Sequence, residues 1–386
     1  MRRPILLVVG VLLVCLAAMP AAGQDESTRA LRLKALKAER LATLPQAAAA
    51  AIAAKTVVVD CAKGGSISAA LANNTGPLVI KLRGTCRENV RIERNDLTLR
   101  GTDPARDGIQ GVAANPQPNA ALELWYSNRV VLENLFVTDS PTSGVGAWFS
   151  ALEMRNCRIE RNGGAGIHIS AASGLTGTEL VVSSSANVGI HSLRQGYVTC
   201  TGCRLENPSV DTVSFWGIAA SSSGGVMTLW DTVVSGPGGI AAFDAGSYID
   251  VDCVNVVSNY PCSINNTQGS VARAYSGGIA ALWGVGAFTG LLNANGGEVA
   301  VYGGQQTRPD ARPNRVSDFG RLTTGMAEDG GPTTTLGNTV LNRFAHAMLW
   351  DGTLLSETLV CGSGSDAWSD TPYPAAQVIG CANVPK

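Results

Sequence analysis

A repeat with a period near 23 residues constrains this chain more than any other feature of its sequence. Six segments align at that spacing, and five of them carry a glycine followed by an aliphatic residue: Gly144-Val145, Gly166-Ile167, Gly189-Ile190, Gly217-Ile218 and Gly239-Ile240. A second column precedes it, at Leu135, Cys157, Leu180, Cys203, Thr232 and Cys253. A unit this short cannot bury its own apolar side, so the repeats are predicted to stack as the coils of a solenoid.

Both columns take one long step at the same place, between Cys203 and Gly217. The irregularity therefore indicates a single inserted loop, which contains Asp211 and Trp216. A long loop beside a strand can form one wall of a cleft.

Composition agrees with an all-β solenoid. The chain has 45 Gly among 386 residues and only 15% charged residues, which suits many short strands joined by tight turns. The formal net charge is −1, and no basic block follows the N-terminal segment. A nucleic acid is therefore not expected as a partner, since it would require a dense phosphate-neutralising face.

The first 23 residues have the three parts of a secretory signal peptide: Arg2-Arg3, an apolar run over residues 5–18, and Ala21-Ala22-Gly23. The alternative is a transmembrane anchor, but the run is shorter than the roughly 20 residues that a span requires. We expect a secreted or extracellular protein, in the periplasm or at the cell surface, with no transmembrane span after removal of the signal.

Residues 24–55 are predicted to form an N-terminal helix and an Ala-rich linker. Leu33, Leu36, Leu41 and Leu44 fall near helical spacing between basic residues. One interpretation is an α-helical cap over the open end of the solenoid, and the other is an oligomerisation helix. The alanine run could equally be a tether. Residues 56–386 are then one solenoid domain, with irregular late coils and a disulfide-closed C-terminal end.

Export makes the cysteines interpretable, because disulfides persist outside the reducing cytosol. Nine cysteines follow the predicted signal peptide, so one thiol stays free or pairs elsewhere. The expected local pairs are Cys61 with Cys86, Cys253 with Cys262, and Cys361 with Cys381. The CxxC at Cys200 and Cys203 could indicate zinc or redox chemistry, but buried sulfur packing is the favoured interpretation because Cys203 belongs to the inward column.

Several stretches carry a resemblance to a known family. The segments "SISAAL", "LVIKLRGTCRENVRI" and "LTLRG", followed by "NCRIERNGGAGIHIS" and "ELVVSSSANVGIHS", resemble the coils of right-handed parallel β-helix proteins of the pectin-lyase-like superfamily. The resemblance covers residues 57–281 and implies an all-β, right-handed parallel β-helix. It specifies the fold and not the chemistry, since the catalytic signatures of the polygalacturonases, alginate-modifying enzymes and pectin methylesterases are missing.

Strand alternation places the first candidate site on one outward face. If the aliphatic residue after each repeat glycine points inward, its successor points outward. That outward column comprises Glu123, Gly146, His168, His191, Ala219 and Ala241, and the next outward column comprises Trp125, Trp148, Ser170, Leu193, Ser221 and Phe243. His168 should adjoin His191, and Trp125 should stack beside Trp148.

This face is predicted to bind polysaccharide. Glu123, Trp125 and Trp148, with Asp211 and Trp216 of the inserted loop, are the candidate substrate-binding residues. His168 and His191 are candidate catalytic bases, and Arg194 could neutralise the carboxylate of an acidic sugar. No lysine lies between Lys81 and Lys386, so a lysine base on the central coils is excluded. The alternative is a solvated strand face with a chance histidine pair.

A second candidate site consists of Asp231, Asp250 and Asp252. Carboxylates on adjacent coils could support acid–base hydrolysis or bind calcium. No cofactor is expected to be required, and calcium is the one candidate. An ordinary polar face is the alternative.

Taken together, these features predict a secreted β-helix that presents an elongated face to a polysaccharide or cell-surface glycan, as a carbohydrate-binding or surface-structural protein. One alternative is a polysaccharide lyase or glycoside hydrolase acting on an acidic polysaccharide. Another is an adhesive or oligomeric surface fibre assembled through the N-terminal helix.

Overall fold

The computed structural model describes residues 54–206, 217–236, 238–254, 262–307, 313–326, 333–350 and 352–381. The chain divides into two compact units, Met1–Thr43 and Leu44–Lys386, and every described residue belongs to the second. The predicted signal peptide, the predicted N-terminal helix with its capping or assembly role, and Asp211 and Trp216 lie outside the described residues.

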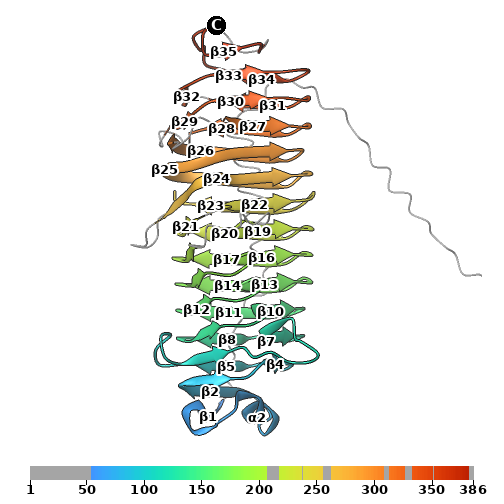
Figure 1. The fold of residues 1–386 in the computed structure, drawn as a ribbon, viewed down its shortest axis with the longest axis vertical. Helices are drawn as coiled ribbons and strands as arrows, with labels where there is room; N and C mark the ends of the chain where they lie inside the picture. Colours follow the sequence, from blue (N-terminus) through green and yellow to red (C-terminus); the bar gives the residue numbers. More distant parts are fainter. Residues whose placement is uncertain are drawn as a thin grey trace, which may run out of the picture. The chain divides into compact units, whose positions relative to one another are not determined.

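The second unit is a parallel β-solenoid of about 13 coils, so the predicted fold class is confirmed, apart from the undescribed N-terminal cap. Each regular coil contributes one strand to each of three parallel sheets, which we call the first, second and third sheet in chain order. Figure 1 shows the coils stacked in sequence order, from β1 and α2 at one end to β35 at the other.

The strands are short, and three late ones turn corners between sheets. The first sheet contains β1 (Lys55–Asp60), β2 (Leu78–Arg83), β5 (Leu97–Arg100), β8 (Val130–Glu133), β11 (Ala151–Arg155), β14 (Gly174–Thr178), β17 (Tyr197–Thr201), β20 (Val226–Trp230), β23 (Tyr248–Asp252), β28 (Arg321–Gly325), β31 (His346–Leu349) and β34 (Asp366–Ser369). The second contains β3 (Thr85–Arg87), β6 (Gly108–Gln110), β9 (Phe136–Thr138), β12 (Arg158–Glu160), β15 (Val181–Ser183), β18 (Arg204–Glu206), β21 (Val233–Ser235), β29 (Thr334–Leu336) and β32 (Thr353–Leu355). The third contains β4 (Val90–Ile92), β7 (Ala120–Trp125), β10 (Ser143–Trp148), β13 (Ile167–Ser170), β16 (Ile190–Leu193), β19 (Ala219–Ser222), β22 (Ile240–Phe243), β27 (Asn314–Ser317), β30 (Thr339–Leu341), β33 (Leu359–Cys361) and β35 (Val378–Ile379). The corner-turning strands are β24 (Ser263–Tyr275), β25 (Ile279–Asn295) and β26 (Glu298–Thr307).

Inward-pointing aliphatic side chains form columns through the interior. In the third sheet Leu122, Val145, Ile167 and Ile190 pair in register on consecutive coils and are fully buried. Burying one such side chain contributes roughly 1.5–3 kcal/mol, and each coil repeats this contribution. The glycine–aliphatic repeat therefore marks the core column, as predicted.

A serine ladder supports the corner between the third and first sheets. Ser127 N donates to Ser150 Oγ at 3.0 Å, and Ser150 N donates to Ser173 Oγ at 3.0 Å. All three residues are buried. Each hydroxyl satisfies a backbone group of the neighbouring coil, so the corner is fixed by more than sheet pairing.

The start of the solenoid holds a short helix, α2 (Ile67–Ala72), after the 3₁₀ helix η1 (Cys61–Lys63). Ser66 caps α2 by accepting a bond from Ala69 N, and the carboxylate of Glu88 accepts bonds from Ile67 N and Ser68 N. A carboxylate at a helix N-terminus satisfies donors that have no partner within the helix.

The late coils continue the stack where the sequence period blurs. Polar side chains join the aliphatic core there: Asn314 and Gln306 exchange side-chain amide bonds of 2.8 and 2.9 Å inside the solenoid. Asn314 also donates to Thr339 Oγ1 at 3.1 Å. Because these groups satisfy one another, they can lie in the interior beside aliphatic residues such as Val316 and Leu341.

Three predicted disulfides are confirmed: Cys61–Cys86, Cys253–Cys262 and Cys361–Cys381. Among the described residues, no helix is long and apolar enough to cross a membrane.

The prediction that Cys200 and Cys203 pack as separate sulfurs is wrong, because they form a disulfide. Cys200 points inward at the end of β17, and Cys203 points inward at the start of the second sheet. Gly202, with a φ of 64°, turns the chain between them, so both side chains converge inside one corner with their Cα atoms 6.0 Å apart. Two coils earlier, Met154 stands where Cys200 would be, and Cys157 is the free cysteine of the described residues.

Alkylation without reductant should distinguish these cysteines. Burial raises the pKa of the Cys157 thiol to about 12, so it should resist alkylation in the native protein and react after unfolding. Cys200 and Cys203 should remain unlabelled in both states, as read by peptide mass mapping. Label on Cys200 in the unfolded, unreduced protein would contradict the disulfide.

Candidate functional site

The outer face of the third sheet brings together the residues predicted from the repeat. His168 pairs with His191 in the sheet, and Trp125 pairs with Trp148. The two indole rings stack with centroids 4.8 Å apart, and the two imidazoles meet edge to face at 5.7 Å. These predicted placements are confirmed, and their chemical roles stay predictions.

We name two columns on this face by their most prominent members. The histidine column comprises Arg91, Glu123, Gly146, His168, His191 and Ala220, and the tryptophan column comprises Trp125, Trp148, Ser170, Leu193 and Ser222. Arg91 lies over the ring of Trp125 at 5.4 Å, and the ring of Trp148 lies 5.5 Å from His168. The stack thus runs without a break from a guanidinium through two indoles to two imidazoles.

Glycine at position 146 determines where Trp148 lies. A Cβ there would approach Cη2 of Trp148 to 2.4 Å and Cζ3 to 2.5 Å, so the indole lies directly over the place of the missing side chain. The glycine therefore lets the ring lie flat on the sheet between Trp125 and His168.

Glu123 lies in the predicted column but is only 5% exposed. Its Oε1 accepts a bond of 2.7 Å from Asn119 N, in the segment that precedes β7. The carboxylate therefore supports its own loop and presents little surface to a ligand.

His191 is shielded from solvent, and His168 is half-buried. His191 is 9% exposed, and its Nε2 lies 3.0 Å from Ser222 Oγ. Burial lowers the pKa of His191 to about 4, with a further contribution from His168. Burial also lowers the pKa of His168, and the charge of Arg194 acts in the same direction. Both imidazoles are therefore neutral at neutral pH.

The register predicted after the inserted loop is wrong by one residue. Ala219, and not Ile218, pairs with Ile190 and Ile240, so Ala220 continues the histidine column and Ser222 the tryptophan column. Ser221 points into the core and is fully buried. The chain has one more residue before β19 than the glycine–aliphatic pattern indicates. Backbone hydrogen bonds to the neighbouring coils determine the register of the strand.

The aspartate site is also displaced. Asp252 pairs with Trp230 and not with Asp231, whose backbone N donates to Asp252 O. The second inward column continues from Thr232 to Cys262, since Val233 pairs with Ser263, so Cys253 was wrongly aligned. In the part of the chain that the structure describes, no group of three or more His, Cys, Asp or Glu side chains could hold a metal ion. Calcium binding by Asp231, Asp250 and Asp252 stays a prediction.

Sequence reasoning missed a third column at the corner that follows the third sheet. Its residues share a left-handed backbone with φ between 48° and 53°, and they are Tyr126, Phe149, Ala171, Arg194 and Ser223. The rings of Tyr126 and Phe149 stack in parallel planes with centroids 4.9 Å apart. The signal was present in the sequence, because Trp125-Tyr126 and Trp148-Phe149 are aromatic pairs one period apart.

Arg194 completes this corner. It is exposed, and no salt bridge or side-chain hydrogen bond joins it to any described residue. Two residues of small size, Ala171 and Ala172, occupy the coil between Phe149 and Arg194, with Phe149 N bonded to Ala171 O and Ala172 N bonded to Arg194 O. We call Tyr126, Phe149, Ala171, Ala172 and Arg194 the corner site.

The glycine at position 146 can be tested directly. Gly146→Ala should expel the Trp148 indole from the sheet, because the added methyl would overlap the ring. Tryptophan fluorescence should shift to longer wavelength as the ring meets water, while the far-ultraviolet circular dichroism stays that of the wild type. An unchanged emission spectrum would contradict the packing of Trp148 over Gly146.

The buried imidazole predicts a pH dependence of stability. The pKa of His191 is about 4 in the folded protein and about 6.5 when unfolded, so the unfolded state binds more protons between these values. The stabilisation, about 3 kcal/mol, is present above pH 6.5 and is lost as the pH falls towards 4. Urea unfolding at pH 7 and pH 4.5 should show a smaller loss for His191→Gln than for the wild type, and equal losses would refute this assignment.

Comparison with known proteins agrees with the topology. A family model described as "Right handed beta helix region" matches residues 57–205. No curated protein matches the chain significantly. Among solved structures, the chain is similar to the pectate lyase Pel9A at 13% identity and a TM-score of 0.47, covering 84% of this chain and 83% of that chain.

Two further solved structures are less similar. A pectin methylesterase variant in complex with a hexasaccharide has 10% identity, a TM-score of 0.29, and coverage of 85% of this chain and 93% of that chain. The alginate lyase AlyGC has 9% identity, a TM-score of 0.23, and coverage of 81% and 76%. Similarities this low carry no argument about the chemistry of the chain. The family match and the three parallel sheets agree on the fold, a right-handed parallel β-helix.

Proposed function

We propose that this protein binds an acidic polysaccharide at the corner site. The observation that carries the proposal is the exposed guanidinium of Arg194, which has no carboxylate partner among the described residues and lies two coils from the exposed ring of Phe149. A sugar carboxylate is the group that a free guanidinium binds best, through two parallel hydrogen bonds.

Phe149 offers the apolar surface. One face of its ring stacks on Tyr126 of the preceding coil, so its other face looks along the solenoid towards Ala171. Phe149 is 49% exposed, and the alanine methyl leaves space beside that face. The apolar face of a sugar ring can pack against an aromatic ring of this kind.

The spacing suits a sugar unit. Successive coils lie about 4.8 Å apart, so Phe149 and Arg194 are separated by about 10 Å along the solenoid at the level of the backbone. A ring resting on Phe149 above the two alanines would therefore bring its carboxylate within reach of the long Arg194 side chain. The rest of a polymer would extend over the neighbouring coils, beyond the space between Phe149 and Arg194.

The site supports binding better than catalysis. A general base works best when its pKa lies near the operating pH, and burial holds the pKa of His191 at about 4. His191 is also too enclosed to touch a bound sugar. A lyase or hydrolase activity using His168 or His191, and an assembly role for residues 25–44, stay predictions.

Secretion belongs to the same proposal. Four disulfides connect described cysteines, and such bonds persist in oxidising compartments. An acidic polysaccharide is a ligand that a protein would meet at a cell surface or outside it.

The proposal is tested by binding to defined oligouronates and to their carboxyl-reduced counterparts. Arg194→Gln should weaken oligouronate binding by about tenfold to a hundredfold, because it removes a charge-assisted bidentate contact. Phe149→Ala should weaken binding of both the acidic and the reduced ligand. Isothermal titration calorimetry at about 0.15 M salt, where distant charges are screened, gives the affinities.

The matched control is Arg83→Gln, which removes an exposed arginine from β2, in the first sheet. It should leave the affinity within about twofold of the wild type, since an isolated surface charge acts weakly at a distance in salt. Equal affinity of the Arg194→Gln variant and the Arg83→Gln control would refute the proposed function. Release of unsaturated or reducing ends during the same incubation would favour the enzyme alternative.

A further inference from the structure

A groove of about 540 Å³ lies on the same sheet face near the C-terminal end of the solenoid. Its walls come from β25, β27 and β30, with Arg315 paired to Val340 and Asn295 paired to Ser317 across adjacent strands. Arg315 and Val340 continue the histidine column, and Asn295 and Ser317 continue the tryptophan column. The groove thus occupies the same outward face as the corner site, on coils where the sequence period gave no candidate.

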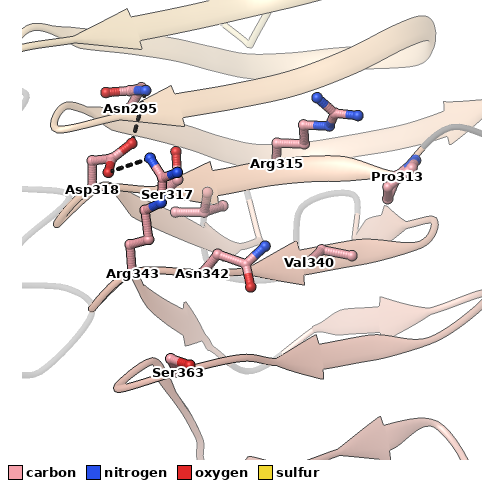
Figure 2. Close-up of a pocket in the computed structure, with 10 residues that line it drawn as sticks. Asn295, Pro313, Arg315, Ser317, Asp318, Val340, Asn342, Arg343 and Ser363 are labelled. Carbon is pink, nitrogen blue, oxygen red and sulfur yellow. Dashed lines mark hydrogen bonds and ion pairs between the residues drawn. The ribbon is translucent and has the colours of Figure 1, made fainter.

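At one end of the groove, the charged and polar side chains bind one another. Asp318 accepts bonds from Arg343 at 3.2 Å and from Asn295 Nδ2 at 3.0 Å. These contacts lower the pKa of Asp318, so its carboxylate is ionised and satisfied. Figure 2 shows this cluster at one end of the groove, where the dashed contacts join Asn295, Asp318 and Arg343.

Arg315 stands apart from that cluster. Figure 2 shows its guanidinium directed away from Asp318. Arg315 is exposed, and no carboxylate among the described residues forms a salt bridge with it. The side chains of Asn342 and Ser363 also line the groove and form no side-chain hydrogen bond with a described residue, so amide and hydroxyl groups accompany the Arg315 guanidinium.

An aromatic pair follows two of the lining residues in the chain. Phe319 and Phe344 come directly after Asp318 and Arg343, and their rings stack with centroids 5.4 Å apart. They are 73% and 55% exposed, and the Phe344 ring lies over Gly364, where a Cβ would approach Cδ1 to 2.4 Å. The corner site also contains a stacked aromatic pair, Tyr126 and Phe149, and an arginine without a carboxylate partner among the described residues.

We propose that this groove is a second, independent binding site for a carboxylate-bearing sugar unit, with Arg315 as the carboxylate ligand. Asn342 and Ser363 would bind sugar hydroxyls, and Val340 would contact the ring. The class of ligand rests on the proposed function, whereas the groove itself, and an Arg315 with no carboxylate partner among the described residues, do not. Two such sites on one face would let a long acidic polymer bind with higher apparent affinity than a short one.

Calorimetric titration with a short oligouronate, too short to reach both places, separates the two sites. Phe149 lies seven coil steps of about 4.8 Å, or about 34 Å, from the coil of Arg315, and Arg194 lies five steps, or about 24 Å, from it. The wild type should bind two equivalents. Arg315→Gln should remove one equivalent or weaken it by about tenfold to a hundredfold, and Arg194→Gln should do the same to the other.

The outcomes separate the two proposals. If the wild type binds one equivalent that only Arg194→Gln abolishes, the second site is refuted and the proposed function stands. If it binds one equivalent that only Arg315→Gln abolishes, the second site stands and the corner site fails. Binding that neither variant changes would overturn both.

Two controls make the assignment specific. The carboxyl-reduced oligosaccharide should show no affinity difference between the wild type and Arg315→Gln. Arg315→Lys retains the charge but loses the planar pair of donors, so it should restore only part of the affinity. Full wild-type affinity of Arg315→Lys would overturn the bidentate contact, and Arg83→Gln should again match the wild type.

Discussion

Parallel backbone bonding between successive coils is the interaction on which every other feature depends. It fixes equivalent residues one above another, about 4.8 Å apart, from one end of the described stack to the other. At that spacing aromatic rings on neighbouring coils stack on each other and occupy each other's faces, as Trp125 and Trp148 do. Apolar ring surface becomes available to a ligand only where such a stack ends at a small residue, as Phe149 does at Ala171.

How far the sequence predicts the structure follows from the same bonding. Between Leu122 and Leu193 the period is unbroken, and the predicted neighbours of His168 and Trp148 are correct. Beyond the inserted loop the pattern places Ile218 where the structure has Ala219. A pattern of side chains cannot say on which side of a corner an extra residue is absorbed, because hydrogen bonding to the next coil decides it. For the same reason, Asp252 pairs with Trp230 and not with the predicted Asp231.

Charge pairing explains why two arginines stand out. Many arginines on the regular coils have an acidic residue in reach, either two residues away on the same strand, as with Arg155 and Glu153, or on an adjacent coil, as with Arg161 and Asp139. Such exposed pairs add little stability but neutralise the cation locally. Arg194 could be singled out from the sequence because it lies on a regular coil. Arg315 could not, because polar core residues obscure the period around it.

Several corners with a left-handed backbone carry bulky aromatic residues. A positive φ costs a bulky residue more than it costs glycine or asparagine, by roughly 1 kcal/mol or more. Phe149, Phe319 and Phe344 nevertheless have φ values of 52°, 63° and 61°. Local backbone preference would favour smaller residues at all three corners. The aromatic rings compensate by stacking on the neighbouring coil, as Phe149 does with Tyr126 and Phe319 does with Phe344. The histidines differ, because backbone pairing keeps them in register while His191 is buried and His168 is half-buried.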